Sequence, residues 1–460
     1  MRAIDGGLAS NGHGHRVGRR PRVMAVSALA ERSAKEDATD AFARSLAANF
    51  EYAGDTAQRL YGFGIDRRRS DPLVREAQFF DAQLGSWKPR VHPVTRLARL
   101  ASALISAAEV DVVPTNGTVL RPPDLRYGGA ASDLWNLPDA QRRADAYFKT
   151  TRKLLPVRLP SPVSAMHWTG PVPARAVGVP NLYCVPDLAA FRLPYASPLD
   201  KRRLLRRWKA IIDAADHLLV SSGACGRDLV RLFAVPEHRF TVLHQVCGDE
   251  FRQGRKAERV PHDQVRSTLD LPHRGYYVCH GPVEMMSNVG RIAEAYLASG
   301  TRRPLLVVGS MGYKGHLEIR TIRDDHVRYF ERGASKIVAK RQIALIDDLP
   351  RNLLAGVVRG ARAVVVPFLY DCVGTAALDA MRFGTPVITS ATGAMPELVA
   401  DAALTVDPYD PRAIAEAIRA VDGDDELRAG LSEKGLRRAA RFGPRAFNAR
   451  IEAVYKALGL

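Results

Sequence analysis

Several features that define whole classes of protein are missing from this 460-residue sequence. No apolar run approaches the ~18–20 residues that a membrane-spanning helix needs. Residues 1–22 lack the apolar core of a signal peptide, so we expect a flexible basic tail there. The cysteines are few and scattered: Cys184, Cys225, Cys247, Cys279 and Cys372. Because they include no CxxC pair, we expect neither a disulfide framework nor a zinc site, a pattern typical of a reducing cytoplasm.

Lysine is also scarce, whereas arginine is abundant. Only 12 of the 67 basic residues are lysine, and 49 acidic residues leave a formal net charge of +18. Residues 1–245 carry +13 of this charge and residues 246–460 carry +5. A GC-rich genome would explain the arginine bias, while the uneven distribution indicates an acidic partner. Since no nucleic-acid-binding module accompanies the charge, we expect no nucleic-acid partner and favour an anionic membrane or acceptor.

The sequence that is present has the composition of a globular protein, with 46% apolar and 25% charged residues. Short β-branched runs alternate with longer amphipathic stretches, which predicts an α/β architecture with parallel sheets. The predicted strands are residues 22–30, 110–114, 182–185, 217–221, 276–281, 305–309, 343–346, 363–367 and 385–390. A charged, turn-rich stretch at 246–275 divides them, so we expect two doubly wound domains with a ligand in the cleft between them.

Residues 363–408 hold the most informative motif. A buried strand is followed by a loop with Asp371, and Gly374-Thr375 precede a helix that holds Asp379. A glycine at a helix start lets a ligand approach bare N–H groups, where the helix dipole favours a phosphate. Taken alone, the two aspartates have a plainer explanation, in which Asp371 caps the helix and Asp379 is a solvated helix charge.

The surrounding sequence favours the ligand-binding interpretation. It resembles the donor-site block of the GT-B glycosyltransferases of family 4 (glycosyl transferases group 1), in which two glutamates are spaced Glu-x7-Glu. Asp371 and Asp379 stand where those glutamates stand, and residues 380–381, 384–388 and 396–397 also match. The resemblance covers residues 160–460, while the sequence before residue 160 is only compatible with it.

This resemblance implies the GT-B fold, with two Rossmann-like doubly wound domains that face each other across a cleft. Residues 23–245 would form the acceptor-side domain and residues 246–444 the nucleotide-sugar-binding domain. Residues 445–460 would form a helix that folds back on the N-terminal domain. The implied enzyme is a retaining hexosyltransferase that moves a sugar from a nucleotide diphosphate-sugar to a lipid-linked or polysaccharide acceptor. It would need no metal or other cofactor, and would act in envelope or exopolysaccharide biosynthesis.

The resemblance also implies roles for individual residues. Asp371 would orient the donor sugar as a catalytic residue, and Asp379 would bind the ribose. The backbone at Gly374 and Thr375 would lie beside the sugar and the diphosphate. Gly281 and Glu284 belong to a second donor-binding segment, residues 281–288.

This second segment departs from the family pattern. The positions that would offer cations to the diphosphate are Pro282, Met286 and Ser287. Loss of such cations removes several kcal/mol of transition-state stabilisation. Lys314, in a glycine-containing loop, is a candidate replacement or else a plain solvated residue. A catalytically silent relative, which binds a glycan or sugar nucleotide and scaffolds a synthase complex, is therefore the alternative to an active enzyme.

The histidine that many relatives have in the cleft is also missing, because Pro186 stands in its place. His167 and His280 are the two alternative cleft histidines, and we assign His167 as the catalytic candidate. Either residue would equally serve as a hydrogen-bonded structural histidine in the core.

Residues 201–209 form a basic segment with six cations in nine residues. Candidate contacts to an anionic membrane or acceptor are Arg202, Arg203, Arg206, Arg207 and Trp208. A basic amphipathic helix gains about 1 kcal/mol per cation near an anionic surface. The protein would then lie in the cytoplasm, peripheral to the inner face of the plasma membrane. Alternatively, the helix covers a sheet and its apolar side chains are core.

Overall fold

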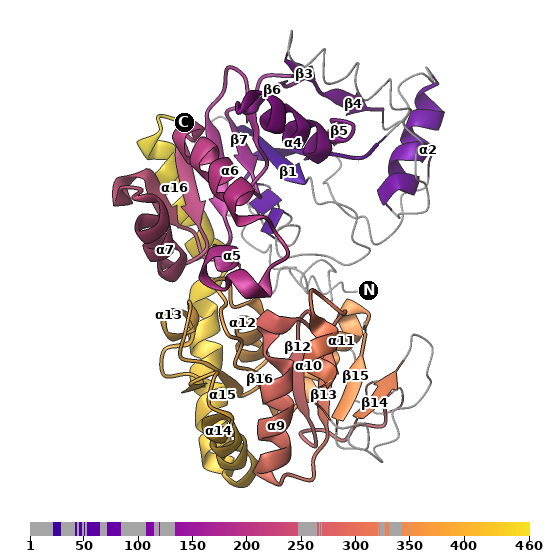
Figure 1. The fold of residues 1–460 in the computed structure, drawn as a ribbon, viewed down its shortest axis with the longest axis vertical. Helices are drawn as coiled ribbons and strands as arrows, with labels where there is room; N and C mark the ends of the chain where they lie inside the picture. The colour runs from indigo at the N-terminus through magenta and orange to yellow at the C-terminus, as the bar shows by residue number, and fades with distance from the viewer. Residues whose placement is uncertain are drawn as a thin grey trace, which may run out of the picture.

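The computed structural model describes residues 22–28, 42–43, 46–47, 50, 53–64, 71–83, 107–114, 119, 134–246, 265, 267, 269–320, 322, 327–330, 343–347 and 349–460. Within these ranges the chain forms two large β-sheets with flanking helices, one in the upper and one in the lower half of Figure 1. The α/β architecture predicted from the sequence is therefore present. The predicted basic tail, apart from Arg22, and most of the predicted linker at 246–275 lie outside the described residues.

The N-terminal sheet has eight strands in the order β11-β10-β9-β7-β1-β2-β5-β4. Their bounds are β1 Val23–Ala28, β2 Thr56–Tyr61, β4 Asp111–Val113, β5 Leu134–Asn136, β7 Ala165–Trp168, β9 Asn181–Val185, β10 His217–Val220 and β11 Phe240–Val242. All neighbouring pairs are parallel except β4 and β5, so the strand predicted at 110–114 is an antiparallel edge. A second, three-stranded sheet consists of β3 (Ala108–Glu109), β6 (Leu155–Arg158) and β8 (Ala174–Ala176).

The described part of this domain has helices between its strands. They are α2 Pro72–Gln83, α4 Ala140–Thr151, α5 Ala189–Arg192, α6 Lys201–Ala214 and α7 Gly223–Phe233, with short 3-10 turns η2 Pro194–Ala196 and η3 Glu237–Arg239. The basic helix α6 begins at the N-cap Asp200, whose carboxylate accepts hydrogen bonds from the backbone N–H groups of Arg202 and Arg203.

The C-terminal sheet has seven parallel strands in the order β14-β15-β13-β12-β16-β17-β18. They are β12 Tyr277–His280, β13 Leu305–Val308, β14 Val327–Phe330, β15 Ile343–Ile346, β16 Ala363–Val366, β17 Val387–Ser390 and β18 Leu404–Val406. Its helices are η4 Met285–Ser287, α9 Val289–Ser299, α10 Gly315–Arg320, α11 Arg351–Gly360, α12 Thr375–Arg382, α13 Met395–Val399, α14 Pro411–Gly423 and α15 Asp425–Ala439. The central strands are apolar and buried on both faces, as parallel strands between helix layers are.

The chain ends with η5 (Ala440–Phe442) and α16 (Pro444–Ala457), and α16 packs on the first domain. Figure 1 shows α16, in yellow, beside α7 in the upper half. Its buried side chains Phe447, Ile451 and Tyr455 share one apolar cluster with strands β1, β9 and β10. Arg22 pairs with Glu452 of α16 and, at 3.0 Å, with Asp55. Among the described residues, no helix is both long and apolar enough to cross a membrane.

Candidate active site at the domain interface

The two domains meet through loops that follow parallel strands, the edge where ligands bind in open α/β sheets. Lys314 Nζ, after β13, donates a hydrogen bond to the Tyr195 carbonyl of the first domain at 3.3 Å. Ser221 Oγ, after β10, lies 3.0 Å from the Cys372 carbonyl, after β16. The loops after these strands therefore form one interface, and most of the predicted site residues belong to them.

Asp371 lies in the loop after β16 and closes the turn that leads into α12. Its Oδ1 accepts hydrogen bonds from the backbone N–H groups of Val373 at 2.8 Å and Gly374 at 2.9 Å. Burial raises the pKa of the Asp371 carboxyl, and these two bonds oppose the shift. Asp371 thus has the capping role that its position in the sequence suggests. The loop that carries it also contacts the other domain.

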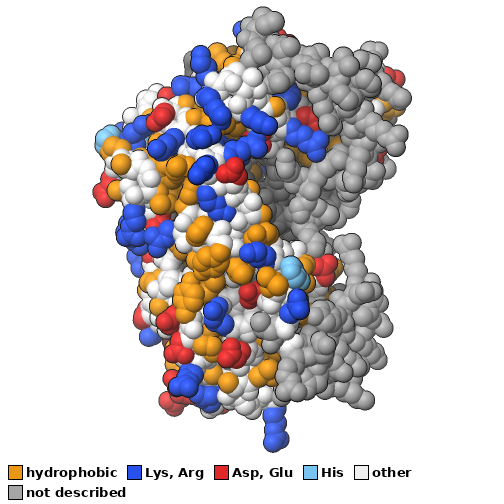
Figure 2. Space-filling model, viewed as in Figure 1, with side chains coloured by type: hydrophobic (Ala, Val, Ile, Leu, Met, Phe, Trp, Pro, Cys, Tyr) orange, Lys and Arg blue, Asp and Glu red, His pale blue; other side chains and the backbone are white. Residues whose placement is uncertain are grey.

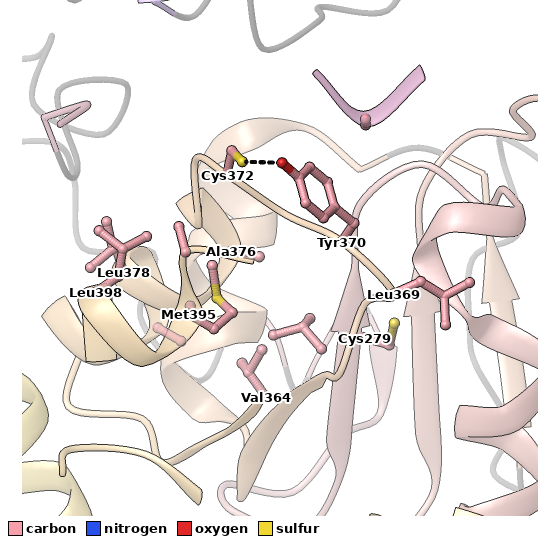
Figure 3. Packing of buried hydrophobic residues seen from close by; sticks show 14 of the residues in the cluster. Cys279, Val364, Leu369, Tyr370, Cys372, Ala376, Leu378, Met395 and Leu398 are labelled. Atoms are coloured by element: carbon pink, nitrogen blue, oxygen red, sulfur yellow. Dashed lines mark hydrogen bonds between the residues drawn. The ribbon is translucent and has the colours of Figure 1, made fainter. Parts of the chain in front are cut away.

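Gly374 lets α12 begin tightly packed against α13. Its φ is +70°, in the left-handed region, and a Cβ on it would lie 2.4 Å from Leu398 Cδ1 and 2.8 Å from Met395 Cε. Figure 3 shows the side chains of Leu398 and Met395 at this point. Only glycine fits such a position. Thr375 is exposed at the first turn of α12, and Asp379 is half-buried one turn further on.

The loops after β12 and β13 pack backbone against backbone. A Cβ on Gly309 would lie 1.7 Å from the Gly281 carbonyl oxygen, and one on Gly312 would lie 2.8 Å from Glu284 Oε2. Glu284 is half-buried and accepts a hydrogen bond from the Tyr313 backbone. Burial first, and then the charge of Asp187 in the other domain, raise the pKa of the Glu284 carboxyl.

The positions expected to carry phosphate-binding cations contact each other instead. Ser287 is buried, and its Oγ donates a hydrogen bond to the Pro282 carbonyl at 2.5 Å. The Met286 carbonyl accepts a hydrogen bond from Leu369 N at 3.0 Å and so ties this segment to the loop after β16. The Lys314 side chain reaches across the interface to Tyr195, so it lies on the face of the second domain where the donor site is expected.

Asp187, at the end of β9, is a site residue that was not singled out from the sequence. Its Oδ1 accepts a hydrogen bond from Ala189 N at 2.8 Å, at the start of α5. Burial raises the pKa of the Asp187 carboxyl, and the charge of Asp371 across the interface raises it further. The charge of Asp371 thus acts on Asp187, and the charge of Asp187 acts on Glu284, across the interface. The signal in the sequence was the place of Asp187 directly after the predicted strand at 182–185, where loops of open α/β sheets bind ligands.

The catalytic assignment of His167 is wrong. His167 lies on β7 with no exposed surface, and its Nε2 is hydrogen-bonded to the Tyr455 hydroxyl of α16 at 2.9 Å. Its ring also packs beside Phe50, and burial lowers the pKa of the imidazole to about 3. The side chain faces the helix that covers the sheet, whereas the ligand edge lies beyond the strand end. His280, at the end of β12, hydrogen-bonds to the backbone of Ala376 on α12 and is therefore the histidine nearer to the site.

The basic helix α6 differs in two of its residues from the predicted surface contact. Trp208 is 3% exposed and packs in the core with Leu204 and Ile211, so it cannot contact a membrane. Arg207 is partly buried and paired with Asp145 of α4 at 2.6 Å. Arg202, Arg203 and Arg206 are exposed, as predicted for an anionic contact. Figure 2 shows Lys and Arg side chains gathered over the region where α4 and α6 lie in Figure 1.

Comparisons with known proteins show what this chain is similar to. Residues 289–438 match the family of glycosyl transferases group 1. The chain is 28% identical over 265 residues to O-antigen chain mannosyltransferase B of Escherichia coli, covering 56% of this chain and 65% of that protein. It is 28% identical over 312 residues to D-inositol 3-phosphate glycosyltransferase 1 of Catenulispora acidiphila, covering 64% and 71%.

Solved structures resemble nearly the whole chain. Sucrose-phosphate synthase from Thermosynechococcus elongatus superposes with a TM-score of 0.60 at 18% identity, covering 95% of this chain and 99% of that one. Anabaena HepE in complex with UDP and glucose gives a TM-score of 0.58 at 10% identity, covering 95% and 100%. At such low identity these likenesses show the fold, and they confirm the predicted two-domain architecture.

Proposed function

Because residues 289–438 belong to the glycosyl transferases group 1 family and the chain has the GT-B fold, we propose that it is a retaining glycosyltransferase. In this proposal a nucleotide diphosphate-sugar donates a hexose to an acceptor, and no metal or other cofactor takes part. The observation that carries the proposal is the loop after β16, where Asp371 and Gly374 lie at the domain interface at the start of α12.

The proposed mechanism uses the loop and the helix start together. The diphosphate would lie at the N-terminus of α12, where Gly374 has no side chain to keep it from the N–H groups of the first turn. As the bond between sugar and phosphate breaks, negative charge builds on the β-phosphate, and these preorganised amides stabilise it. Asp371 would orient the sugar ring and Asp379 would hold the ribose hydroxyls. The raised pKa of Asp371 has burial as its main cause, which suits a carboxyl in a site that excludes water.

We propose a lipid-linked or polysaccharide acceptor in envelope or exopolysaccharide biosynthesis, at the cytoplasmic face of the plasma membrane. The exposed Arg202, Arg203 and Arg206 on α6 support an anionic acceptor or membrane surface. The Escherichia coli relative carries a name that refers to O-antigen chains, and the Catenulispora relative one that refers to D-inositol 3-phosphate. Both names are compatible with an acceptor that is a glycan or carries a phosphate.

One observation favours a second function, that of a silent relative which binds a sugar nucleotide and scaffolds a synthase. The segment expected to supply phosphate cations has Pro282, Met286 and Ser287, and Ser287 is bonded back to Pro282. Among the described residues of this segment and the loop after β13, the leaving diphosphate of an active enzyme would be stabilised by backbone amides and Lys314.

A panel of UDP-, GDP- and dTDP-sugars separates the two functions. Binding is measured by calorimetry, and turnover is measured as nucleotide release with and without membrane extracts that supply acceptors. The enzyme proposal expects one donor that both binds and releases nucleotide, and turnover that rises with acceptor. Binding of a donor without release under any condition would instead support the silent relative.

A further inference from the structure

Both chain neighbours of Asp371 are held by the other domain. The Tyr370 hydroxyl donates a hydrogen bond to Asp228 Oδ2 on α7. On the other side of Asp371, the Cys372 carbonyl lies 3.0 Å from Ser221 Oγ, which is also 2.5 Å from the Pro186 carbonyl. The loop that carries Asp371 is therefore anchored to the first domain at the positions immediately before and after it.

The anchor at Tyr370 belongs to a buried network. Asp228 is 5% exposed, and its Oδ1 pairs with Arg192 Nη1 of α5 at 3.1 Å. The Arg192 guanidinium lies 6.0 Å from the centre of the Tyr370 ring. Figure 3 shows Cys372 Sγ directed at the Tyr370 hydroxyl, 3.1 Å away. Burial, together with the neighbouring Cys372 and Asp228, raises the pKa of Tyr370, so its hydroxyl keeps the proton that it donates.

These contacts make the pose of Asp371 depend on the other domain. The carboxylate of Asp371 caps the turn through Val373 and Gly374, which fixes it relative to α12. The anchors fix the same turn relative to α7 and the end of β9. Separation of the domains would break the hydrogen bond between the Tyr370 hydroxyl and Asp228, so its contribution to stability would be lost.

We propose that Tyr370, Asp228 and Ser221 are positioning residues, which hold the Asp371 loop in one pose against the first domain. For its catalytic consequence the proposal rests on the glycosyltransferase function given above. Asp371 would take its productive position only when the acceptor-side domain is in contact, so that acceptor-side closure and donor orientation occur together. Without the anchors, the donor nucleotide would still bind to the second domain, but the sugar would be poorly oriented.

The test compares Tyr370→Phe, Ser221→Ala and Asp228→Asn with the wild-type full-length chain. Tyr276→Phe is the matched control, because the Tyr276 hydroxyl also makes a buried bond, to the Val357 carbonyl at 2.8 Å, within the second domain. Amide hydrogen exchange of the peptide spanning residues 368–376 measures the anchoring directly. Donor-nucleotide affinity and kcat are measured on the same samples.

We expect about tenfold faster exchange of that peptide in the three variants and no change there in Tyr276→Phe. We expect kcat to fall by about tenfold or more while nucleotide affinity stays within about twofold. Unchanged exchange in all three variants would overturn the anchoring. Faster exchange with unchanged kcat would overturn the positioning role. If the wild-type chain transfers no sugar, the proposed function fails, whereas the exchange data still decide the anchoring.

Discussion

Glu397 of the second domain accepts a hydrogen bond from His244 Nε2, at 2.8 Å, in the segment where the chain leaves the first domain. The same carboxylate accepts hydrogen bonds from the backbone N–H groups of Gly223 at 2.9 Å and Ala224 at 3.2 Å. It thus fills the N-terminus of α7, where the helix dipole favours a negative charge. A side chain on Gly223 would collide with it, since a Cβ there would lie 2.9 Å from Glu397 Oε2. Glu397 therefore joins the two domains and the segment between them.

The first prediction concerns the pH dependence of this contact. Burial opposes ionisation of Glu397, but the hydrogen bonds from His244 and the α7 backbone outweigh it and lower the pKa below the usual 4.5. A lowered carboxyl pKa gives stability that is present above the unfolded value and lost as pH falls through the folded value. We expect the urea midpoint of the wild type to fall relative to that of Glu397→Gln below about pH 4.5. Glu416→Gln, a change at an exposed position on α14, is the control and should show the same fall of the urea midpoint at acid pH as the wild type. If the urea midpoints of Glu397→Gln and wild type have the same pH dependence, the prediction is contradicted.

His167 gives a second pH prediction at higher pH. Burial lowers its pKa from 6.5 to about 3, so the unfolded chain binds a proton that the folded chain does not between these values. This effect of His167 is therefore absent above pH 6.5. Below that value it lowers the free energy of unfolding as the pH decreases toward 3, by up to about 1.4 kcal/mol per pH unit. His167→Gln should make this slope shallower, as measured by urea unfolding at several pH values. His238→Gln, at an exposed position, is the control and should keep it, and an unchanged slope in His167→Gln would contradict the burial of this ring.

Two glycines with opposite environments test the packing at the start of α12. Gly374→Ala places a Cβ against Leu398 and Met395 at a left-handed φ, and should destabilise the protein by about 1–3 kcal/mol. Gly430 lies within α15 with nothing within 4 Å of a Cβ. Gly430→Ala should therefore stabilise the protein by about 0.5–1 kcal/mol. Thermal unfolding of both variants measures the difference, and equal effects would show that α12 does not begin as described.

The exposed arginines of α6 predict that the protein binds to anionic membrane surfaces. We expect Arg202→Glu, Arg203→Glu and Arg206→Glu together to abolish sedimentation with vesicles that contain anionic phospholipid, since each cation contributes about 1 kcal/mol near such a surface. A triple change to Glu at Arg412, Arg419 and Lys434, which are exposed in the second domain, is the charge-matched control. If the control loses binding equally, net charge and not α6 is responsible. Trp208→Phe should leave vesicle binding unchanged, because Trp208 is buried.

Structural features that depend on residues close together in the sequence could be predicted. Asp371, Gly374 and Asp379 fall within nine residues, so a local motif places them on one loop and one helix. The apolar runs of β12, β13 and β16 were recognisable because strands buried on both faces are almost continuously apolar. β5 and β6, within residues 115–160, were not recognised from the sequence, because they are only three and four residues long.

Contacts between distant segments could not be predicted in this way. Asp228 and Tyr370 are separated by 142 residues, and no local pattern links an acid on one helix to a hydroxyl in another domain. His167 was assigned to the site as one of two alternative cleft histidines, but the direction of its side chain depends on α16, 288 residues later. Trp208 was ambiguous for a similar reason, because an apolar stripe does not reveal whether it faces a sheet or a membrane.

The central claim is that the Asp371 loop orients a sugar for transfer, and one measurement tests it most directly. Nucleotide release from the donor that binds is compared between the wild type and Asp371→Asn, with donor affinity measured on both. We predict that Asp371→Asn loses about a hundredfold or more in kcat, while donor affinity changes by less than about threefold, since the carboxylate acts on orientation and charge in the transition state. Equal turnover by both proteins, or a donor that binds the wild type and is never released as nucleotide, would contradict the account.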